Sequence, residues 1–314
     1  MRDVQLPITL VPYDDESANG YILRSLQANG VNMHWLRRSV GLPELHMLTQ
    51  THARAVAWVL QCSELWLVAK LDFRWKSEGG YFWLWNNYEF FCANHLRRRH
   101  PQVCVQCVHL NGYCKQIWDL AVVTHCSEHQ TILLDECEHC RTRLRWDRPS
   151  VDVCHCGHVL TSVSEAVSNG APFFELLDIL QVQMRKEFVG DGERGTLTSK
   201  FLTNMSIPGV LTLIYAFGIL EREYQVIGPS LRTKSLRTLE WAGIVQRAWC
   251  RLETLNLEQP NKSLQGAVDA ISLSHLLNKS INPVDQQVAM LLLVSFPQGL
   301  QSKFLSRTCQ ATLF

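Results

Sequence analysis

The N-terminal part of the chain carries two short apolar stripes at helical spacing. Apolar residues three and four positions apart lie on one face of a helix, so each stripe predicts a helix with one buried face. The first stripe runs from Tyr21 to Leu26 and ends at Gly30, and the second follows Asn32 and ends at Gly41. Asparagine is a favourable N-cap, and glycine commonly ends a helix. The pattern therefore predicts two helices joined by a tight turn.

Two helices around such a turn have the outline of a helix-turn-helix. Side chains able to cap the first helix are those of Asp14, Asp15 and Ser17. Polar side chains that could face outward from the second helix are those of His34, Arg37 and Arg38. A DNA-reading helix would use the two arginines. Any antiparallel helix pair gives the same pattern, so both interpretations stay open.

Residues 170–314 show helical spacing that is interrupted at glycine and proline. The expected helices cover residues 173–180, 197–220, 236–255, 266–278 and 284–296. In the second of these segments Ser206 can cap a helix that has Pro208 in its first turn. That segment is also a second candidate helix-turn-helix, although its high apolar content favours burial. The stripes fit either a bundle core or a dimer face.

An aromatic segment and a basic run separate the first helices from the middle of the chain. Nine aromatic residues lie between residues 71 and 91. Rings this dense could stack nucleic-acid bases, but they more often form a core or a contact surface for a partner protein, which we favour. Arg97, Arg98 and Arg99 follow, just before Pro101. This run either contacts phosphates or ends a helix in solvent.

Composition limits the class of protein. Apolar residues make up 46% and charged residues 19%, which excludes a largely disordered chain. The net charge of +1 excludes a global polycation, so any nucleic-acid contact must come from local patches. No apolar run reaches the roughly 18 residues of a membrane-spanning helix, and no basic start precedes an apolar block as in a signal peptide. We expect a cytoplasmic protein with no membrane partner.

The strongest chemical signal is a block of cysteines in the middle of the chain. Eight of the twelve cysteines lie between Cys104 and Cys156, mostly in tight pairs. Without an export signal, such pairs predict metal ligands rather than disulfides. The block divides the chain into an N-terminal helical region at 1–98, a double zinc-finger module at 99–160 and a C-terminal helical region at 161–314.

Four ligand pairs make two closed zinc sites, because zinc takes four thiolate or imidazole ligands in a tetrahedron. Sequential pairing assigns the first site Cys104, Cys107, Cys126 and His129. It assigns the second site Cys137, Cys140, Cys154 and Cys156. A cross-braced arrangement stays open, and an iron–sulfur cluster is a minor alternative. Rival ligands, which we expect on the surface or beside the sites, are His109, Cys114, His125, His139, His155 and His158.

Four protein ligands leave no open position on zinc, so the metal would hold the fold rather than activate water. The chain also lacks the two-histidine helical motif of many zinc hydrolases, a phosphate-cradling loop and a nucleophile turn. We therefore expect two structural zinc ions and no enzyme activity.

Three arginines follow the third ligand pair at alternating positions. In an extended strand Arg141, Arg143 and Arg145 would share one face, which suits contact with DNA or RNA phosphates. Acidic residues on both sides of them indicate a mixed, solvated face instead. Both interpretations stay open.

The order of these motifs resembles the TniQ/TnsD family of transposon target-selection proteins, over about half of the chain. The N-terminal family pattern is a proline, then Asp-Glu-Ser, then an arginine, here Pro12, Asp15-Glu16-Ser17 and Arg24. Between and after the metal ligands the pattern continues with Gly112, Tyr113, Trp118, Leu120, Leu133-Leu134-Asp135, Leu144, Trp146, Gly157 and His158. Where the family often has proline or glycine, this chain has Val105, Ser127, Glu138 and Arg141. Arg141 indicates that its turn need not use the left-handed conformation.

The resemblance implies an adaptor that marks the insertion site of a transposon. Such proteins bind target DNA directly or act with an RNA-guided CRISPR (Cascade-type) complex, they recruit an AAA+ ATPase regulator, and some are homodimers. Charge and position make these residues candidates for nucleic-acid contact: Arg37, Arg38, Arg97, Arg98, Arg99, Arg141, Arg143 and Arg145. The alternatives are a zinc-dependent DNA-binding transcription regulator and a metal-dependent nuclease or hydrolase, and the closed zinc sites argue against the latter.

We expect a mainly α fold. A small central zinc-binding α+β module of tandem zinc fingers would lie between a helix-turn-helix-like N-terminal domain and a C-terminal helical domain.

Overall fold

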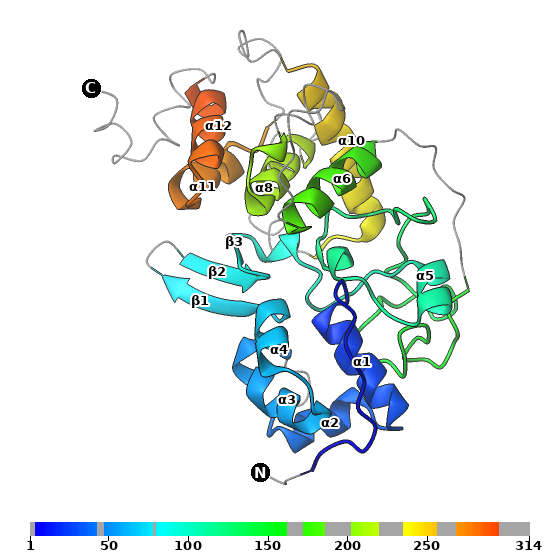
Figure 1. The fold of residues 1–314 in the computed structure, drawn as a ribbon. Coiled ribbons are helices and arrows are strands. Elements are labelled where there is room, and N and C mark those ends of the chain that lie inside the picture. Colours follow the sequence, from blue (N-terminus) through cyan, green and yellow to red (C-terminus); the bar gives the residue numbers. More distant parts are fainter. Residues whose placement is uncertain are drawn as a thin grey trace. The chain divides into compact units, whose positions relative to one another are not determined.

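The computed structural model describes residues 4–42, 47–77, 80–161, 172–185, 202–219, 235–255 and 268–294. The chain divides into two compact units, residues 1–169 and residues 170–314. It is mainly helical with one small sheet, which confirms the expected fold class (Figure 1). The expected boundary near residue 98 falls inside the first unit, and whether its two parts fold separately stays a prediction.

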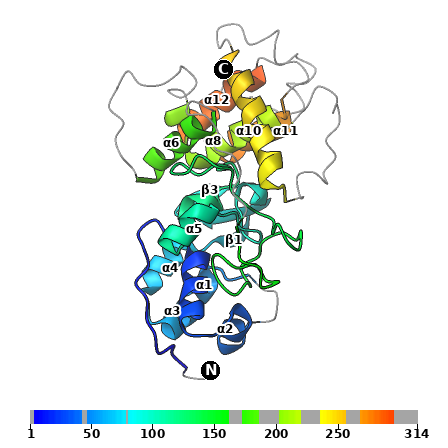
Figure 2. The ribbon, with the colours of Figure 1, turned by 90° about the vertical axis from the view of Figure 1, so that its right-hand side faces the viewer.

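The first unit begins with the two predicted helices, α1 (Ala18–Ala28) and α2 (Met33–Ser39). The apolar stripe of α1 is buried, and Leu26 is fully so. The Asn32 side chain caps α2 by accepting the backbone N–H of Trp35 at 2.9 Å. Two short helices follow a 3-10 turn and pack against each other: α3 (Ala53–Leu60) and α4 (Glu64–Lys70) (Figure 2).

The aromatic segment forms a three-stranded antiparallel sheet, which its aromatic content alone does not predict. The strands are β1 (Phe73–Ser77), β2 (Gly80–Trp85) and β3 (Tyr88–Phe90), in that order. Asn86 and Asn87 join the last two strands with φ angles of 50° and 63°. Two successive left-handed residues are typical of the tight hairpin turn that matches the twist of the strands.

The middle of the chain holds little regular structure. It contains α5 (Val105–Asn111), the 3-10 turn Gln116–Asp119 and several isolated β-bridges, including Val103 with Leu134 and Glu136 with Arg143. Its buried apolar side chains include those of Trp118, Leu120, Leu133, Leu144 and Leu160. A segment with so few regular hydrogen bonds needs other cross-links, and the cysteine clusters described below can supply them.

The second unit is a group of helices around one buried helix. Its elements are α6 (Pro172–Arg185), α8 (Ile207–Gly218), α10 (Thr238–Glu253), α11 (Ala270–Lys279) and α12 (Pro283–Val294). Every residue of α8 is buried, and the predicted cap is present, because Ser206 accepts the backbone N–H of Gly209. These helices match the expected ones, whose segments 197–201, 220, 266–267 and 295–296 lie outside the described residues.

A close helix crossing holds this unit together. Gly218 at the end of α8 lies against Ile244 of α10, where a Cβ atom would overlap the Ile244 backbone. Arg247 of α10 donates from Nε to the Gly218 carbonyl at 2.8 Å.

Within the described ranges, no helix is long and apolar enough to cross a membrane.

Candidate functional site

The first cluster of candidate metal ligands joins α5 to a tight turn. Cys104 is the N-cap residue of α5 and Cys107 lies in its first turn. The Cys107 sulfur lies 3.5 Å from the Cys126 sulfur and 3.2 Å from His129 Nδ1. Nδ1 of His129 also lies 3.4 Å from the Cys104 sulfur. The four ligand atoms are all within 4.8 Å of one another.

The second cluster is built from two turns without a helix. Cys137 lies 3.9 Å from Cys156, and Cys140 lies 3.7 Å from Cys154, measured between sulfurs. These four ligand atoms also lie within 4.8 Å of one another. The structure therefore groups the ligands in sequential pairs, as the spacing predicts, and not in a cross-braced arrangement. None of the rival histidines, nor Cys114, belongs to either group of ligand atoms among the described residues.

A left-handed residue follows the second ligand of three of the four pairs. The φ angles are 57° at Gln130, 56° at Arg141 and 86° at Gly157. The backbone N–H of Gln130 and of Arg141 returns to the carbonyl of the first ligand of its own pair, at 2.8 and 3.0 Å. The expectation that Arg141 avoids this conformation is therefore wrong. The turn requires a positive φ, and a non-glycine residue there accepts a small backbone strain.

The donor atoms fit zinc. Tetrahedral zinc with sulfur bonds of about 2.3 Å places its sulfurs roughly 3.8 Å apart, close to the observed separations. The hydroxyl of Thr142, 2.9 Å from the Cys140 sulfur, lowers the pKa of that thiol to about 6. A thiolate is the form that binds metal. The two clusters could thus hold two metal ions.

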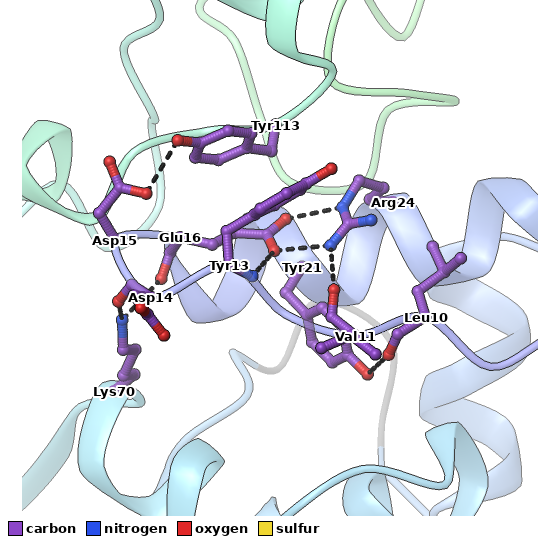
Figure 3. Close-up of polar contacts among 10 residues, drawn as sticks. All are labelled: Leu10, Val11, Tyr13, Asp14, Asp15, Glu16, Tyr21, Arg24, Lys70 and Tyr113. Atoms are coloured by element: carbon purple, nitrogen blue, oxygen red, sulfur yellow. Dashed lines mark hydrogen bonds and ion pairs between the residues drawn. The ribbon is translucent and has the colours of Figure 1, made fainter.

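The N-terminal motif forms a polar cluster at the start of α1 (Figure 3). The Glu16 carboxylate is fully buried and accepts two hydrogen bonds from Arg24, at 2.8 and 2.7 Å. The Arg24 guanidinium also donates to the Val11 carbonyl and lies 4.8 Å from the centre of the Tyr13 ring. This cluster fixes the chain segment that leads into α1.

The same segment is attached to the cysteine region, residues 104–156. The Ser17 hydroxyl donates to Asp119, and the Ser17 backbone N–H donates to the Cys114 carbonyl at 2.9 Å. Gly20 of α1 lies so close to Cys114 that an added Cβ would stand 2.9 Å from the Cys114 Cβ. Cys114 is thus a buried packing residue beside α1 rather than a metal ligand. The start of α1 therefore packs directly against the cysteine region.

The candidate arginines occupy different environments. Arg97 is 4% exposed and ion-paired with Asp135 at 3.2 Å, and Arg143 reaches the same carboxylate at 3.3 Å. Arg98 pairs with Asp72 at 2.5 Å. Four other arginines of the set are exposed: Arg38, Arg99, Arg141 and Arg145. Burial lowers the pKa of the half-buried Arg37, and nearby Asp147 partly offsets this.

Four of these side chains line one depression in the first unit. It is lined by Arg37, Arg98, Arg99, Arg145, Trp146 and Asp147, among others. These residues come from α2, from the basic run before Pro101 and from the loop after the third ligand pair. Arg38 and Arg141 lie outside this depression. Spacing along the chain does not reveal that three separate segments meet here.

The fold and the two cysteine clusters define a mainly helical protein with two candidate metal centres. Residues 7–133 match the family model described as TniQ. This part of the chain is therefore a TniQ domain, which confirms the resemblance and associates the protein with transposition. The match contains the whole first cluster and ends before the second. No curated protein matches the chain.

Proposed function

We propose that this protein is an adaptor for target-site selection in transposition. It recognises its target by binding DNA directly or through a guide-RNA Cascade-type complex, and it recruits the AAA+ ATPase of the transposon. The observation that carries the proposal is the TniQ domain, whose N-terminal motif is joined through Ser17 and Asp119 to the cysteine region. An adaptor needs such a rigid connection between the surfaces that meet different partners.

The two metal centres support a structural role. We propose one zinc ion in each cluster, held by Cys104, Cys107, Cys126 and His129 and by Cys137, Cys140, Cys154 and Cys156. Bound zinc would cross-link a region that has few regular hydrogen bonds. Because four protein ligands leave no position for water or substrate, we propose no catalytic activity for the protein.

Nucleic-acid contact would come from the arginines that solvent reaches. Arg99 and Arg145 are exposed, whereas Arg97 is committed to Asp135 in the interior. Arg38 and Arg141 are also exposed and remain candidates. We place the protein in the cytoplasm, where DNA, guide-RNA complexes and the ATPase are present, and we propose a homodimer as the form that engages them.

The test is a pull-down of the purified AAA+ ATPase from the same transposon by the full chain, followed by an insertion assay. We expect retention of the ATPase and insertions at a defined site that depend on this protein. A zinc-dependent transcription regulator, the second candidate, would instead bind an operator selectively, would not retain the ATPase and would leave insertion unchanged. Glu16→Ala, which disrupts the N-terminal motif, should reduce ATPase retention more than Asp14→Ala, which changes an exposed neighbour.

A further inference from the structure

The depression in the first unit gathers positive charge from three chain segments. Four guanidinium groups line it, those of Arg37, Arg98, Arg99 and Arg145, together with the Asp147 carboxylate. Arg98 is paired with buried Asp72, and Arg145 is paired with Asp147 at 3.0 Å. The lining thus contains four guanidinium groups and one carboxylate. The chain as a whole has a net charge of only +1, so this excess is local.

The depression is small and offers hydrogen-bond donors. Its cavity volume is about 50 Å³, and one water molecule needs roughly 10–15 Å³ on the same measure. The depression therefore has room for a small ligand such as a tetrahedral anion. The indole N–H of Trp146, a residue 7% exposed, is buried and has no hydrogen-bond partner among the described residues. An unpaired buried donor beside several guanidinium groups favours an anionic acceptor.

We propose that this depression binds one phosphate of a nucleic-acid backbone. Phosphate suits it because guanidinium groups donate paired hydrogen bonds to phosphate oxygens, and because Arg99 and Arg145 are exposed at its edge. A phosphate bound there fixes the position of the nucleic acid but reads no sequence. The inference rests on the proposed function for its ligand, since both target DNA and a guide RNA carry this group.

The Asp147 carboxylate limits the strength of the site. It holds Arg145 at 3.0 Å and places a negative charge in the lining. The Asp147 carboxylate would therefore repel a bound phosphate. Removal of this charge should strengthen binding, an effect that mere loss of structure would not produce.

The experiment measures binding of the full zinc-loaded chain to labelled duplex DNA and to labelled single-stranded RNA across a salt series. The test variants are Arg99→Gln, Arg145→Gln and Asp147→Asn. The matched controls are Arg54→Gln and Lys76→Gln, which remove the same charge from exposed positions outside the depression. Thermal unfolding verifies that each variant is folded, and Arg99→Gln removes a side chain that is exposed.

We expect Arg99→Gln and Arg145→Gln to weaken binding equally for all sequences and to lower the slope of log Kd against log salt by about 1 each. Asp147→Asn should tighten binding, and the two controls should change the slope less than the test variants do. The probe whose affinity responds identifies DNA or RNA as the source of the phosphate. Wild-type affinity and slope in Arg99→Gln and Arg145→Gln would overturn the proposal, as would equal losses in the controls or no binding of either probe by the wild-type protein. ATPase retention that persists in those cases would leave the adaptor function standing.

Discussion

The Ser17 hydroxyl donates to both carboxylate oxygens of Asp119, at 3.1 and 3.0 Å, across 102 positions of the chain. Ser17 is the N-cap residue of α1, yet its side chain makes no capping hydrogen bond. The serine of the N-terminal motif thus connects α1 to the cysteine region instead of closing its own helix. Either role leaves a serine at the start of the helix, so the local sequence does not distinguish them.

This contact makes stability depend on pH. Burial raises the pKa of Asp119 from 3.8 to about 7, while the Ser17 hydroxyl and Lys70 lower it. Because the folded protein binds this proton more tightly than the unfolded chain, the associated stability is full below pH 4 and is lost as the pH rises through 7. Asp119→Asn should therefore weaken the pH dependence of the free energy of unfolding between pH 4 and 7. Urea unfolding of both proteins at each pH measures the difference.

Ser17→Ala provides the complementary variant. It removes a hydrogen bond that lowers the Asp119 pKa, so the loss of stability should continue to a higher pH than in the wild type. Metal-ligand protonation affects all three proteins alike and cancels in the comparison. Parallel pH profiles for wild type and Asp119→Asn would show that the fold does not raise the pKa of the Asp119 carboxyl.

The ion pair of Glu16 and Arg24 is a second source of stability. Glu16 is fully buried, and the Arg24 side chain is 16% exposed. Glu16→Ala leaves the guanidinium without its carboxylate and should cost about 3–5 kcal/mol in free energy of unfolding. Adding Arg24→Leu should recover part of that loss, because the second change removes the unpaired charge. Denaturant unfolding measures both, and Asp14→Ala at an exposed position should stay within about 0.5 kcal/mol of wild type.

The number of zinc ions bound per chain should depend on the two cysteine clusters. We expect two zinc ions per chain by elemental mass spectrometry, and one in Cys126→Ser or Cys137→Ser, because each substitution removes one ligand of one cluster. Cys250→Ser, at an exposed cysteine outside both clusters, should keep two. Chelation should unfold residues 104–156, as amide exchange in that segment would reveal. Full metal content in both ligand variants would contradict the assignment.

The two groups of candidate metal ligands could be predicted from the sequence because their geometry is mostly local. A two-residue spacing brings two donors into one turn, and the structure has both groups in the predicted pairs. The helix ends were equally local: Asn32 and Ser206 both cap as expected. The sheet was predictable in principle from the alternation in β1 and the Asn86-Asn87 turn.

Other features depend on distant partners and could not be predicted from spacing. Arg148 lies next to the arginines that we expected at the surface, yet it is 1% exposed and donates to the carbonyls of Arg145, Ser150 and Val151. Its environment arises from a loop that wraps around the guanidinium. The presence of an arginine in the sequence shows where a positive charge is, but it does not show whether the side chain is exposed or buried.

Two glycines in helices should respond oppositely to alanine. At Gly209 of α8 an added Cβ would overlap the carboxylate of Asp285, a fully buried side chain that also accepts from Ser206 and Ser280. Gly209→Ala should therefore destabilise by about 1–3 kcal/mol. Gly243→Ala in α10 meets only the flexible end of Arg247 and should stabilise by about 0.5–1 kcal/mol through helix propensity. Thermal unfolding compares the two, and equal effects would contradict the packing at Gly209.

Substitutions of Arg97 and Arg99 should affect different properties of the protein. The change at Arg97 should reduce stability, and the change at Arg99 should reduce nucleic-acid binding. Arg97→Gln removes a buried partner of Asp135 and should cost about 3–5 kcal/mol in free energy of unfolding, because a carboxylate that is 10% exposed loses one of its guanidinium groups. Arg143, 3.3 Å from the same carboxylate, should hold the loss towards the lower end of that range. Arg99→Gln changes an exposed side chain and should leave stability within about 0.5 kcal/mol while weakening nucleic-acid binding. Denaturant unfolding and binding titrations on the same preparations test both halves. A stability loss at Arg99, or wild-type stability in Arg97→Gln, would mean that the two side chains do not lie as the structure places them.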